Sequence, residues 1–394
     1  MGTNMPYAAG PISCQLSDDA WAKLKFEILV YGNPHWVTAL VKKSDFLQEK
    51  VKAIDFDHIS TVKDLMDAYK DSSVQSRALA TCAMAYENAL KDEARPTIIL
   101  GLAGPLVAAG LRKVIADMVK FGIVDAIVTI GAIPYQDFYQ AQGYSHYKCS
   151  PRIDDLKLRD FFLDRIYDTI VDENKFRETD EKIGDIAGEL EPKGYSSREF
   201  MEILGDHTNG DQGSILYNCR KYGVPMFLPA LNDSSIGIGL TGLYYKARKA
   251  KKPFMSIDPI RDNWELTQLK INSDKTGVIY IGGGVPKNYI QQTEVICETL
   301  GYDKGGHHYA IQITTDTPQW GGLSGCTFEE AQSWGKINRD AKKSVAYVEA
   351  SIGLSLMVGY ILQSGAWKGR KRLKFKWDED MLQSVKQVPL GIKK

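Results

Sequence analysis

The stretch TGVIYIGGGVPKN, residues 276–288, contains an apolar run, a glycine-rich turn and the start of an amphipathic segment. The apolar run has hydrophobic residues on successive positions, which is typical of a strand buried on both faces. Small residues in the turn allow backbone N–H groups to approach a phosphate at the positive end of the following helix. The alternative is tight packing of a strand against a helix, because the turn does not match GxGxxG. Either way the stretch predicts a strand, a turn and a helix of an α/β fold.

Similar apolar runs recur along the chain and are separated by stretches with helical periodicity. Strands that alternate with helices in this way predict a mostly parallel sheet with helices on both faces. The runs are TIILGL (97–102), VDAIVTIG (124–131), VPMFLPA (224–230), PFMSIDP (253–259), HYAIQITT (308–315) and SVAYVEAS (344–351).

Three further regions surround this pattern. Residues 17–95 have mainly helical periodicity, with FEILVYG (26–32) as a candidate short strand. The charged insertion 151–212 has helical periodicity and no strand signal, so it is predicted to be a helical lid or a surface that docks on another subunit. Near the C-terminus, KGRKRLKFKW (368–377) is interpreted as a solvated edge strand or an interface, with a nucleic-acid patch as the alternative.

The composition excludes several function classes. The 394 residues contain 49 Lys and Arg against 49 Asp and Glu, so no global field indicates a nucleic-acid or membrane partner. Six cysteines are scattered singly, which predicts a reduced, cytoplasmic protein without disulfides or a zinc site. No signal sequence or membrane span is predicted, and the adjacent His307 and His308 would point to opposite faces of a strand, so no metal is expected.

Ligands of open parallel sheets bind beyond the carboxyl ends of the strands, so the loops that follow the apolar runs are the candidate site. The turns GLAGPLVAAG (101–110) and IGGGVPKN (281–288) together suggest a nucleotide. In the loop after residue 228, turn chemistry or capping explains Asn232, Asp233 and Ser234, or else Asp233 accepts from a ribose hydroxyl or a cationic ligand. Glu349 is interpreted either as a residue that binds the ribose or as a surface acid at the end of a strand.

The segment FEEAQSWGKINRDAKK, residues 328–343, reads as an exposed helix. Thr327 and Glu330 have capping-box spacing, so a cap is one interpretation of Glu330. Lys336 lies beside Trp334 and a glycine, where partial desolvation would favour the neutral amine that attacks a carbonyl or an imine. A solvated lysine is the alternative, because helix geometry alone does not direct Lys336 toward Glu330.

Four blocks of sequence carry a resemblance to a known family. They are VDAIVTIG, VPMFLPALNDSSIG, IYIGGGVPKN and, above all, EEAQSWGKINRDA followed by AYVEAS. In this order they resemble the deoxyhypusine synthase family, which includes homospermidine synthases, over about residues 55–365. The resemblance implies a Rossmann-like fold, bound NAD, a homotetramer with active sites shared between subunits, and transfer of an aminobutyl group from a polyamine.

The resemblance also implies a division of the chain. Residues 1–54 would be a mainly helical N-terminal extension, and residues 55–367 the NAD-binding catalytic domain with its helical insertion. Residues 368–394 would be a basic C-terminal tail.

Individual roles follow only from matching positions of the family's motifs. Lys336 would be the catalytic lysine that forms a Schiff base, with Glu330, Trp334 and Asn288 as substrate-binding residues. The positions that match NAD contacts are Thr129, Asp233, Gly283, Thr315, Gly321 and Glu349.

The chain departs from the family around the polyamine. Ile238 and Leu323 stand where the family has carboxylates, Asn288 where it has a histidine, and Gln136 where it has a glutamate. Because a buried ammonium without a partner is costly, these changes should weaken a tricationic substrate or change which polyamine fits.

The resulting prediction is NAD-dependent 4-aminobutyl transfer from spermidine or a related polyamine through Lys336. The altered carboxylates favour a small amine acceptor such as putrescine, as in homospermidine synthesis. A lysine of the translation initiation factor 5A precursor is the alternative acceptor. From another class, the chain would be an inactive NAD-binding paralogue that serves as a regulatory subunit; the missing acids favour that reading, and the retained SWGK motif opposes it.

Overall fold

The computed structural model describes residues 42–392. The chain divides into two units, Met1–Val51 and Lys52–Lys394. Of the first unit, the described part contains one short helix, α2 (Lys43–Phe46). The candidate strand FEILVYG and most of the predicted N-terminal extension lie outside the described residues, so the boundary at residue 54 stays a prediction.

The second unit is built on a six-stranded sheet in the order β11-β10-β9-β1-β2-β7. All neighbouring pairs in this sheet are parallel, as the apolar runs predicted. Its strands are β1 (Thr97–Leu102), β2 (Ala126–Thr129), β7 (Met226–Phe227), β9 (Thr276–Ile281), β10 (His307–Ile313) and β11 (Ile337–Ala346). The predicted α/β fold class is therefore confirmed.

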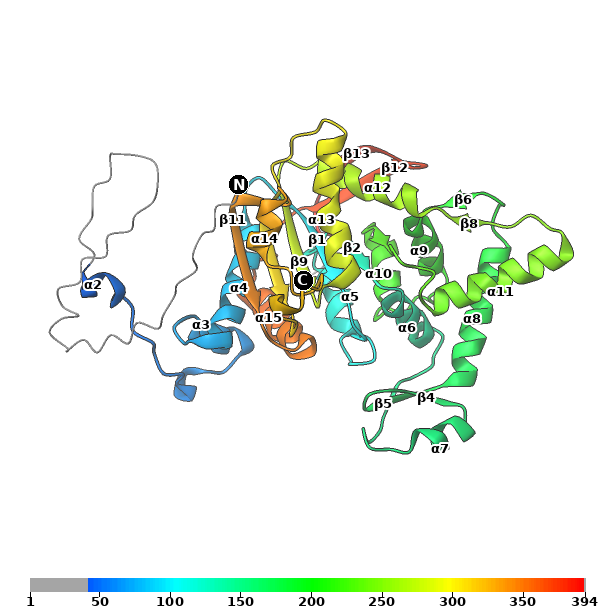
Figure 1. Ribbon diagram of the computed structural model, residues 1–394, viewed down its shortest axis with the longest axis horizontal. Coiled ribbons are helices and arrows are strands. Elements are labelled where there is room, and N and C mark those ends of the chain that lie inside the picture. Colours follow the sequence, from blue (N-terminus) through cyan, green and yellow to red (C-terminus); the bar gives the residue numbers. More distant parts are fainter. Residues whose placement is uncertain (1–41, 393–394) are drawn as a thin grey trace, which may run out of the picture. The chain divides into compact units, whose positions relative to one another are not determined.

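Helices cover both faces of this sheet (Figure 1). Along β1, Ile98 and Leu100 belong to one core cluster and Ile99 to another, so successive side chains pack on opposite faces. The helices and 3-10 turns of this unit are η1 (Phe56–His58), α3 (Val62–Lys70), α4 (Val74–Lys91), α5 (Arg112–Lys120), α6 (Ala132–Ala141), α7 (Asp155–Asp160), α8 (Glu173–Gly188), α9 (Ser197–Asp206), α10 (Ile215–Tyr222), α11 (Ser235–Ala250), α12 (Pro259–Ile271), α13 (Gly284–Thr299), η2 (Pro318–Trp320), α14 (Phe328–Ser333) and α15 (Ala350–Ser364).

The strand order creates a topological switch point. From β1 the chain adds β2 and β7 on one side, and then β9, β10 and β11 on the other. The connections after β1 and β9 therefore leave in opposite directions, which opens a crevice at the carboxyl ends of these two neighbours. This is the arrangement of dinucleotide-binding folds, and it places the two glycine-rich turns side by side.

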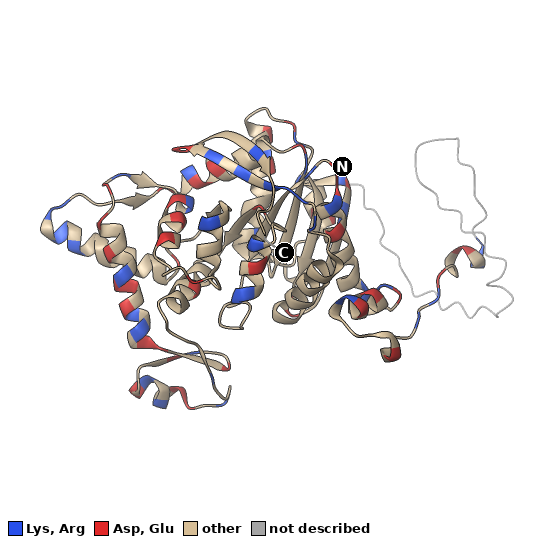
Figure 2. Cartoon of the chain, turned by 180° about the vertical axis from the view of Figure 1, so that it is seen from behind, with Lys and Arg blue, Asp and Glu red and all other residues tan. Residues whose placement is uncertain are grey.

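The insertion 151–212 is not purely helical, so that part of the prediction is wrong. It contains α7, α8 and α9, but also β4 (Leu163–Ile166) and β5 (Thr169–Asp172), which form a three-stranded antiparallel sheet with β3 (Tyr147–Lys148). These strands are too short for an alternating pattern to reveal them. Positive and negative side chains alternate along α8 (Figure 2), which explains why the region reads as a charged helix.

The run PFMSIDP was predicted as a strand of the main sheet and is not part of it. It contributes β8 (Ser256–Ile257), which pairs with β6 (Gly194–Tyr195) in a separate two-stranded sheet.

The C-terminal segment, predicted as a basic tail, is a folded hairpin. Strands β12 (Arg372–Asp378) and β13 (Met381–Val388) pair antiparallel. Two of its basic residues are buried: Arg370 donates to Asp125, and Arg372 donates to the carbonyl oxygens of Val119 and Lys120. These two cations therefore attach the C-terminal segment to α5 and to the loop before β2 instead of forming a solvated patch.

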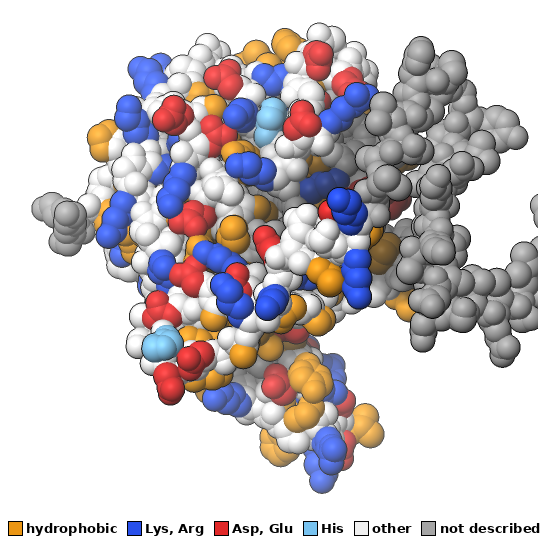
Figure 3. All heavy atoms as spheres, turned by 90° about the vertical axis from the view of Figure 1, so that its left-hand side faces the viewer, with side chains coloured by type: hydrophobic (Ala, Val, Ile, Leu, Met, Phe, Trp, Pro, Cys, Tyr) orange, Lys and Arg blue, Asp and Glu red, His pale blue; other side chains and the backbone are white. Residues whose placement is uncertain are grey.

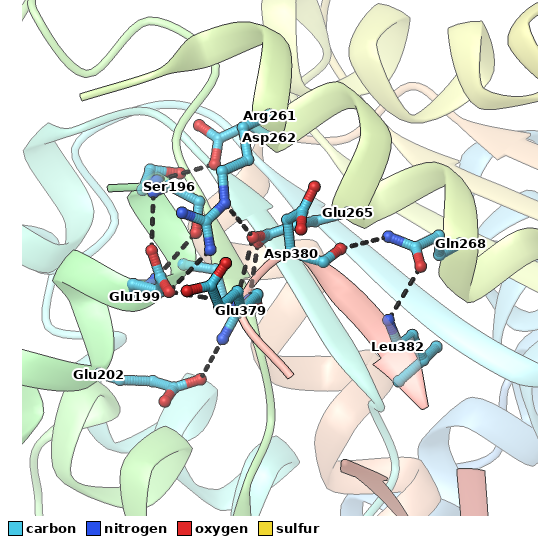
Figure 4. Close-up of polar contacts among 12 residues, drawn as sticks. Ser196, Glu199, Glu202, Arg261, Asp262, Glu265, Gln268, Glu379, Asp380 and Leu382 are labelled. Atoms are coloured by element: carbon cyan, nitrogen blue, oxygen red, sulfur yellow. Dashed lines mark hydrogen bonds and ion pairs between the residues drawn. The ribbon is translucent and has the colours of Figure 1, made fainter. Parts of the chain in front are cut away.

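A buried polar cluster joins this hairpin to α9 and α12 (Figure 4). The Arg198 guanidinium donates to both carboxylate oxygens of Glu265, at 2.7 and 3.1 Å, and to the carbonyl oxygen of Glu379 at 3.0 Å. Gln268 donates to the carbonyl oxygen of Asp380 at 2.6 Å. The arginine is buried together with its carboxylate partner, so the pair sets how the hairpin lies on the helices.

Two surface properties agree with the composition. On the face that Figure 3 shows, acidic and basic side chains are interspersed, and no field of a single sign forms over it. Within residues 42–392, every helix is too short or too polar to cross a membrane.

Candidate active site

A cavity of about 320 Å³ lies at the switch point between β1 and β9. It falls within the size range of small-molecule sites. Its walls come from the turns after β1, β9 and β10 and from the start of α15: Ala103, Gly104, Pro105, Leu106, Ala109, Gly282, Gly283, Thr314, Thr315, Asp316, Ser324, Glu349 and Ala350.

Glycines permit the close approach of backbone in this cavity. Gly104 and Gly282 have φ values of +94° and +74°, which residues other than glycine rarely adopt. A Cβ on Gly283 would lie 2.5 Å from the Cα of Ser324, so only glycine lets the two loops touch. Helix α13 begins at Gly284, whose N–H donates to the Ser324 hydroxyl at 2.9 Å, and the N–H of Gly282 donates to the carbonyl oxygen of Ile313. Of the three glycines in this turn, Gly283 is therefore the one that could donate to an anion in the cavity.

Glu349 caps α15 at the cavity. Its Oε2 accepts from the backbone N–H groups of Ser351 and Ile352, at 2.9 and 3.3 Å, and from the Ser351 hydroxyl. Burial raises the pKa of Glu349, but these hydrogen bonds outweigh burial and lower it. Glu349 also lines the cavity, so its carboxylate is placed to accept from a ligand hydroxyl.

The predicted cofactor residues are only partly brought together. Gly283, Thr315 and Glu349 line the cavity. Thr129 is buried at the end of β2, where its hydroxyl donates to the carbonyl oxygen of Leu102 at 3.3 Å. Asp233 lies in the turn after β7 and Gly321 ends η2, and neither lines this cavity.

The segment 328–343 is not an exposed helix. Helix α14 ends at Ser333, and β11 starts at Ile337. Gly335 terminates the helix at a φ of +70°, with its N–H bonded to the carbonyl oxygen of Gln332 and that of Lys336 to Ala331. This is a Schellman motif, which the glycine after Trp334 signals in the sequence.

This turn determines the position of Lys336. Its backbone carbonyl oxygen accepts from His307 N–H at 3.0 Å, which ties the residue to β10. Its Nζ lies 5.2 Å from the centroid of the Trp334 ring, within cation–π range. The Trp334 side chain is 65% exposed, so the amine and the indole are presented together at the surface of this chain.

The capping interpretation of Glu330 does not hold for its carboxylate. Thr327 caps α14 by accepting from Glu330 N–H at 3.0 Å, but α14 has no reciprocal capping box. The carboxylate lies beside the Cys326 thiol. It forms no ion pair with a described residue, and it lies on α14, one turn before Trp334.

Lys287, on the buried face of α13, is a functional candidate that the sequence analysis missed. Its Nζ donates to Gln312 Oε1 at 2.8 Å and to the carbonyl oxygens of Cys326 at 2.5 Å and Ser324 at 3.4 Å. The ammonium thus holds the loop of residues 324–326 against α13. Lysine immediately after a glycine-rich turn was the available signal, but the sequence alone does not show which face of the helix it occupies.

The Cys326 thiol lies near several charged groups of this region. Burial raises its pKa, the ammonium groups of Lys287 and Lys336 lower it, and the Glu330 carboxylate raises it. None of these four residues lines the first cavity, whose nearest lining residue in sequence is Ser324.

The lowered pKa of Lys287 predicts how the free energy of unfolding depends on pH. Burial lowers it from 10.5 to about 8 in the folded protein. Between these two values the unfolded chain binds more protons than the folded one, so the free energy of unfolding rises with pH. Relative to Lys287→Met, wild type should gain about 1–2 kcal/mol between pH 8 and pH 9.5, as measured by urea unfolding. A constant difference across this range would contradict the shift.

The predicted substrate residue Asn288 lies in a second cavity of about 350 Å³ on α13. Leu323 lines the same cavity, next to Ser324 of the first one. Ile238 is elsewhere, because it lines a cavity between α8 and α11 with Asp180 and Glu181. Within residues 42–392 no group of three or more His, Cys, Asp or Glu is placed to hold a metal, and all five described cysteines are free.

Comparison with known proteins identifies relatives of this chain. Residues 64–361 match the deoxyhypusine synthase family. The chain is 46% identical over 300 residues to the "Probable deoxyhypusine synthase 2" of Methanosarcina acetivorans, covering 75% of this chain and 85% of that protein. It is 40% identical over 340 residues to the "Deoxyhypusine synthase-like protein" of Chlorobaculum tepidum, covering 85% and 95%.

A solved structure shares the fold. The crystal structure of a "putative deoxyhypusine synthase from Entamoeba histolytica" superimposes with a TM-score of 0.56 and covers 84% of this chain and 100% of that one. Its sequence identity is 18%, so this similarity concerns the fold alone.

Proposed function

The chain belongs to the deoxyhypusine synthase family, and from that premise we propose that it is an NAD-dependent 4-aminobutyltransferase with Lys336 as its nucleophile. The observation that carries this proposal is the Schellman turn after α14. It holds the Lys336 amine beside an exposed indole, at the end of the short helix α14 that follows the loop lining the cavity. The donor would be spermidine or a related polyamine.

The residues of the first cavity suit NAD, the family's cofactor. The glycine turn before α13 lines the cavity and lets the pyrophosphate approach the backbone closely, and the Glu349 carboxylate would accept from a ribose hydroxyl. Thr315 and Gly283 would line the nucleotide. When bound, NAD would supply hydride chemistry, accepting a hydride from the donor and returning it to the product.

Lys336 would act on the oxidised donor. Its neutral Nζ adds to the imine carbon, and the bond from this carbon to the departing nitrogen breaks. 1,3-Diaminopropane leaves with the proton that Lys336 gave up, and the aminobutyl group remains on Nζ as an imine. An acceptor amine then adds to the same carbon, which releases Lys336 before the new imine is reduced.

Trp334 and Glu330 would hold the cationic donor for this step. The exposed indole face attracts an ammonium chain and gives its methylene groups an apolar surface. The Glu330 carboxylate, on the preceding turn of α14, would pair with one ammonium group.

Our preferred acceptor rests on the positions at which this sequence differs from the family. Because the chain lacks carboxylates at Ile238 and Leu323, we favour a small amine, as in homospermidine synthesis, over a lysine of the factor 5A precursor. A homotetramer with shared sites would cover the exposed side chains near the site, since Ile238 is 61% and Leu323 is 49% exposed in one chain.

Borohydride trapping tests the proposal. The protein is incubated with NAD and radiolabelled spermidine, reduced, digested and mapped by mass spectrometry. Label on the peptide that contains Lys336, dependent on NAD, is the expected result. Label on Lys287 would move the nucleophile to the other lysine of the site. Absence of label with bound NAD for every polyamine offered would instead favour an inactive NAD-binding paralogue.

The glycine of the Schellman turn gives a second prediction. Gly335 has a left-handed backbone conformation, and the Cβ of an alanine at this position would lie 2.9 Å from Glu298 Oε1. We expect a loss of about 1 kcal/mol in stability and a fall in kcat of about tenfold or more, because the Lys336 backbone must shift. Urea unfolding and steady-state turnover measure the two effects.

Gly301→Ala is the matched control for this prediction. Gly301 follows α13 with a φ of +82°, and a Cβ there would meet no atom within 4 Å. It should lose similar stability and keep its kcat. Equal turnover of the two variants would contradict a positioning role for Gly335.

A further inference from the structure

Four polar side chains form a continuous series of contacts in the core where α12 and α13 lie side by side on the sheet (Figure 1). Lys270 and Glu294 form an ion pair at 2.6 Å, and each side chain is 1% exposed. The Lys270 ammonium also donates to Thr276 Oγ1 at 3.3 Å, and Thr276 Oγ1 lies 2.8 Å from His307 Nδ1. We call this series the buried chain: Glu294 of α13, Lys270 of α12, Thr276 of β9 and His307 of β10.

The donors and acceptors of the buried chain give it one direction. Lysine has no acceptor, so Thr276 Oγ1 accepts from Lys270. Among the described residues, His307 Nδ1 is the partner that remains for the Thr276 hydroxyl, so the hydroxyl donates to it and the ring proton is on Nε2. Burial and the nearby charge of Lys270 lower the pKa of His307 well below its ordinary value. The ring is therefore neutral and held in one tautomer.

The buried chain ends on the backbone of Lys336. The N–H of His307 donates to the Lys336 carbonyl oxygen at 3.0 Å, whereas the Lys336 N–H is bonded within the turn, to Ala331. Two residues further on, the Asn338 amide donates to the carbonyl oxygen of Gly305 at 2.7 Å, on the exposed side of the strand. His307 is thus the buried contact that fixes the turn to the sheet.

Regular pairing between β10 and β11 does not by itself set the position of Lys336. Ile337 pairs with His307 and Lys342 with Tyr309, so β11 advances five residues where β10 advances two. A bulge of this kind separates the register before it from the ladder after it. The register of the turn therefore depends on how His307 is held.

The charges of the buried chain suit a role in specifying position. A buried ion pair gains little net stability, because the loss of hydration offsets the attraction, and its best-attested role is to specify one arrangement. Neither carboxylate oxygen of Glu294 has a hydrogen-bond donor besides Lys270 among the described residues. Burial lowers the pKa of Lys270, and the Glu294 carboxylate opposes this shift. The pair is therefore satisfied only when α12 and α13 keep this arrangement.

Resting on the proposed function, we infer that the buried chain positions the Lys336 nucleophile. It holds His307 in one orientation, and His307 in turn fixes which residue before the bulge pairs with β10. A slip of one residue would turn the Lys336 side chain to the opposite face of the strand. The four members of the buried chain line neither of the two cavities on α13, so they act through the turn and not on the substrate.

Two substitutions at Thr276 test this inference on the full chain, with NAD and the polyamine that labels Lys336. Thr276→Val removes the hydroxyl that joins Lys270 to His307. It should lower kcat about tenfold or more, because a small displacement of the nucleophile spoils its approach to the imine. The KM for the donor should change little, since the residues proposed to bind it are intact. Thr276→Ser keeps the hydroxyl and should keep kcat within about threefold of wild type.

Thr97→Val is the matched control. Thr97 pairs with Thr276 across β1 and β9 and is similarly buried, but its hydroxyl lies 2.6 Å from Ser273 Oγ. This variant should shift the midpoint of urea unfolding to a similar extent and keep its kcat. Equal kcat values for Thr276→Val and Thr97→Val would overturn the inference.

A double variant separates position from stability. Lys270→Met combined with Glu294→Leu replaces the ion pair by apolar side chains, which are often as stable as a buried pair. Its urea midpoint should stay at or above that of wild type, while kcat falls about tenfold. A folded double variant with the kcat of wild type would overturn the role of the ion pair.

Hydrogen exchange gives a measurement that does not require turnover. In Thr276→Val the His307 N–H should exchange about tenfold faster than in wild type, and in Thr97→Val it should not. If no polyamine labels Lys336 in wild type, the proposed function fails, and the exchange of His307 still decides whether the buried chain holds the turn. If Lys336 is labelled and His307 exchanges equally in both variants, the transferase stands and only the positioning role is refuted.

Discussion

Lys336→Ala is expected to lower kcat by at least about 10³-fold, because no other described side chain occupies the position of its amine on the turn after α14. The backbone contacts of residue 336 to Ala331 and His307 do not involve the side chain, so the turn should survive the substitution. Affinity for NAD should change little, since Lys336 does not line the nucleotide cavity. Steady-state kinetics and NAD titration measure the two quantities.

Two further variants give this experiment its controls. Lys336→Arg keeps the positive charge but has no amine that deprotonates readily, so it should be as inactive as the alanine variant. Lys342→Ala removes an exposed lysine from the same strand and should retain activity. Activity of Lys336→Ala within tenfold of wild type would rule out Lys336 as the nucleophile.

Glu265→Ala is expected to lower the free energy of unfolding by about 3–5 kcal/mol. The substitution leaves the buried guanidinium of Arg198 without its main counter-charge and also removes a partner of Arg261 at 3.0 Å. Arg198 contacts the carbonyl oxygen of Glu379 and stacks on Trp377 at 4.4 Å, so the C-terminal hairpin should loosen as well. Urea unfolding measures the change in stability.

Glu202→Ala is the matched control for the buried pair. Glu202 binds the same arginine at 3.2 Å but is partly exposed, so its loss should cost about 1 kcal/mol or less. Similar losses for the two variants would show that burial does not strengthen the dependence on Glu265.

The strands of the central sheet were predictable because their burial on both faces requires apolar residues. Five of the six further apolar runs, and the run that opens the glycine turn at residue 282, became parts of the central sheet, since a strand covered on both faces must be apolar at successive positions. The exception, PFMSIDP, contains two prolines, Ser256 and Asp258 among its apolar residues, and it pairs outside the sheet, where Ser256 is exposed and Ile257 half-buried. Its apolar residues alone were therefore not a sufficient sign of a buried strand.

The errors share one physical cause. The segment 328–343 has helical periodicity, but Gly335 ends the helix and pairing with β10 turns the following residues into a strand. Likewise, the segment that contains Arg370 and Arg372 was predicted to be a basic tail, because the sequence does not show the ion pair and hydrogen bonds that these two arginines make inside the fold. Long-range contacts overrode the local pattern in both places.

The sequence alone was sufficient for the fold class and for the family, because these depend on burial patterns and on motifs of consecutive residues. The tertiary structure alone decided that Gly283, Thr315 and Glu349 share one cavity, that Lys287 binds the loop of residues 324–326, and that Asn288 and Leu323 line a second cavity. Each of these depends on which way a side chain points from its helix or strand. That direction is set by packing between segments far apart in the chain, which no local pattern encodes.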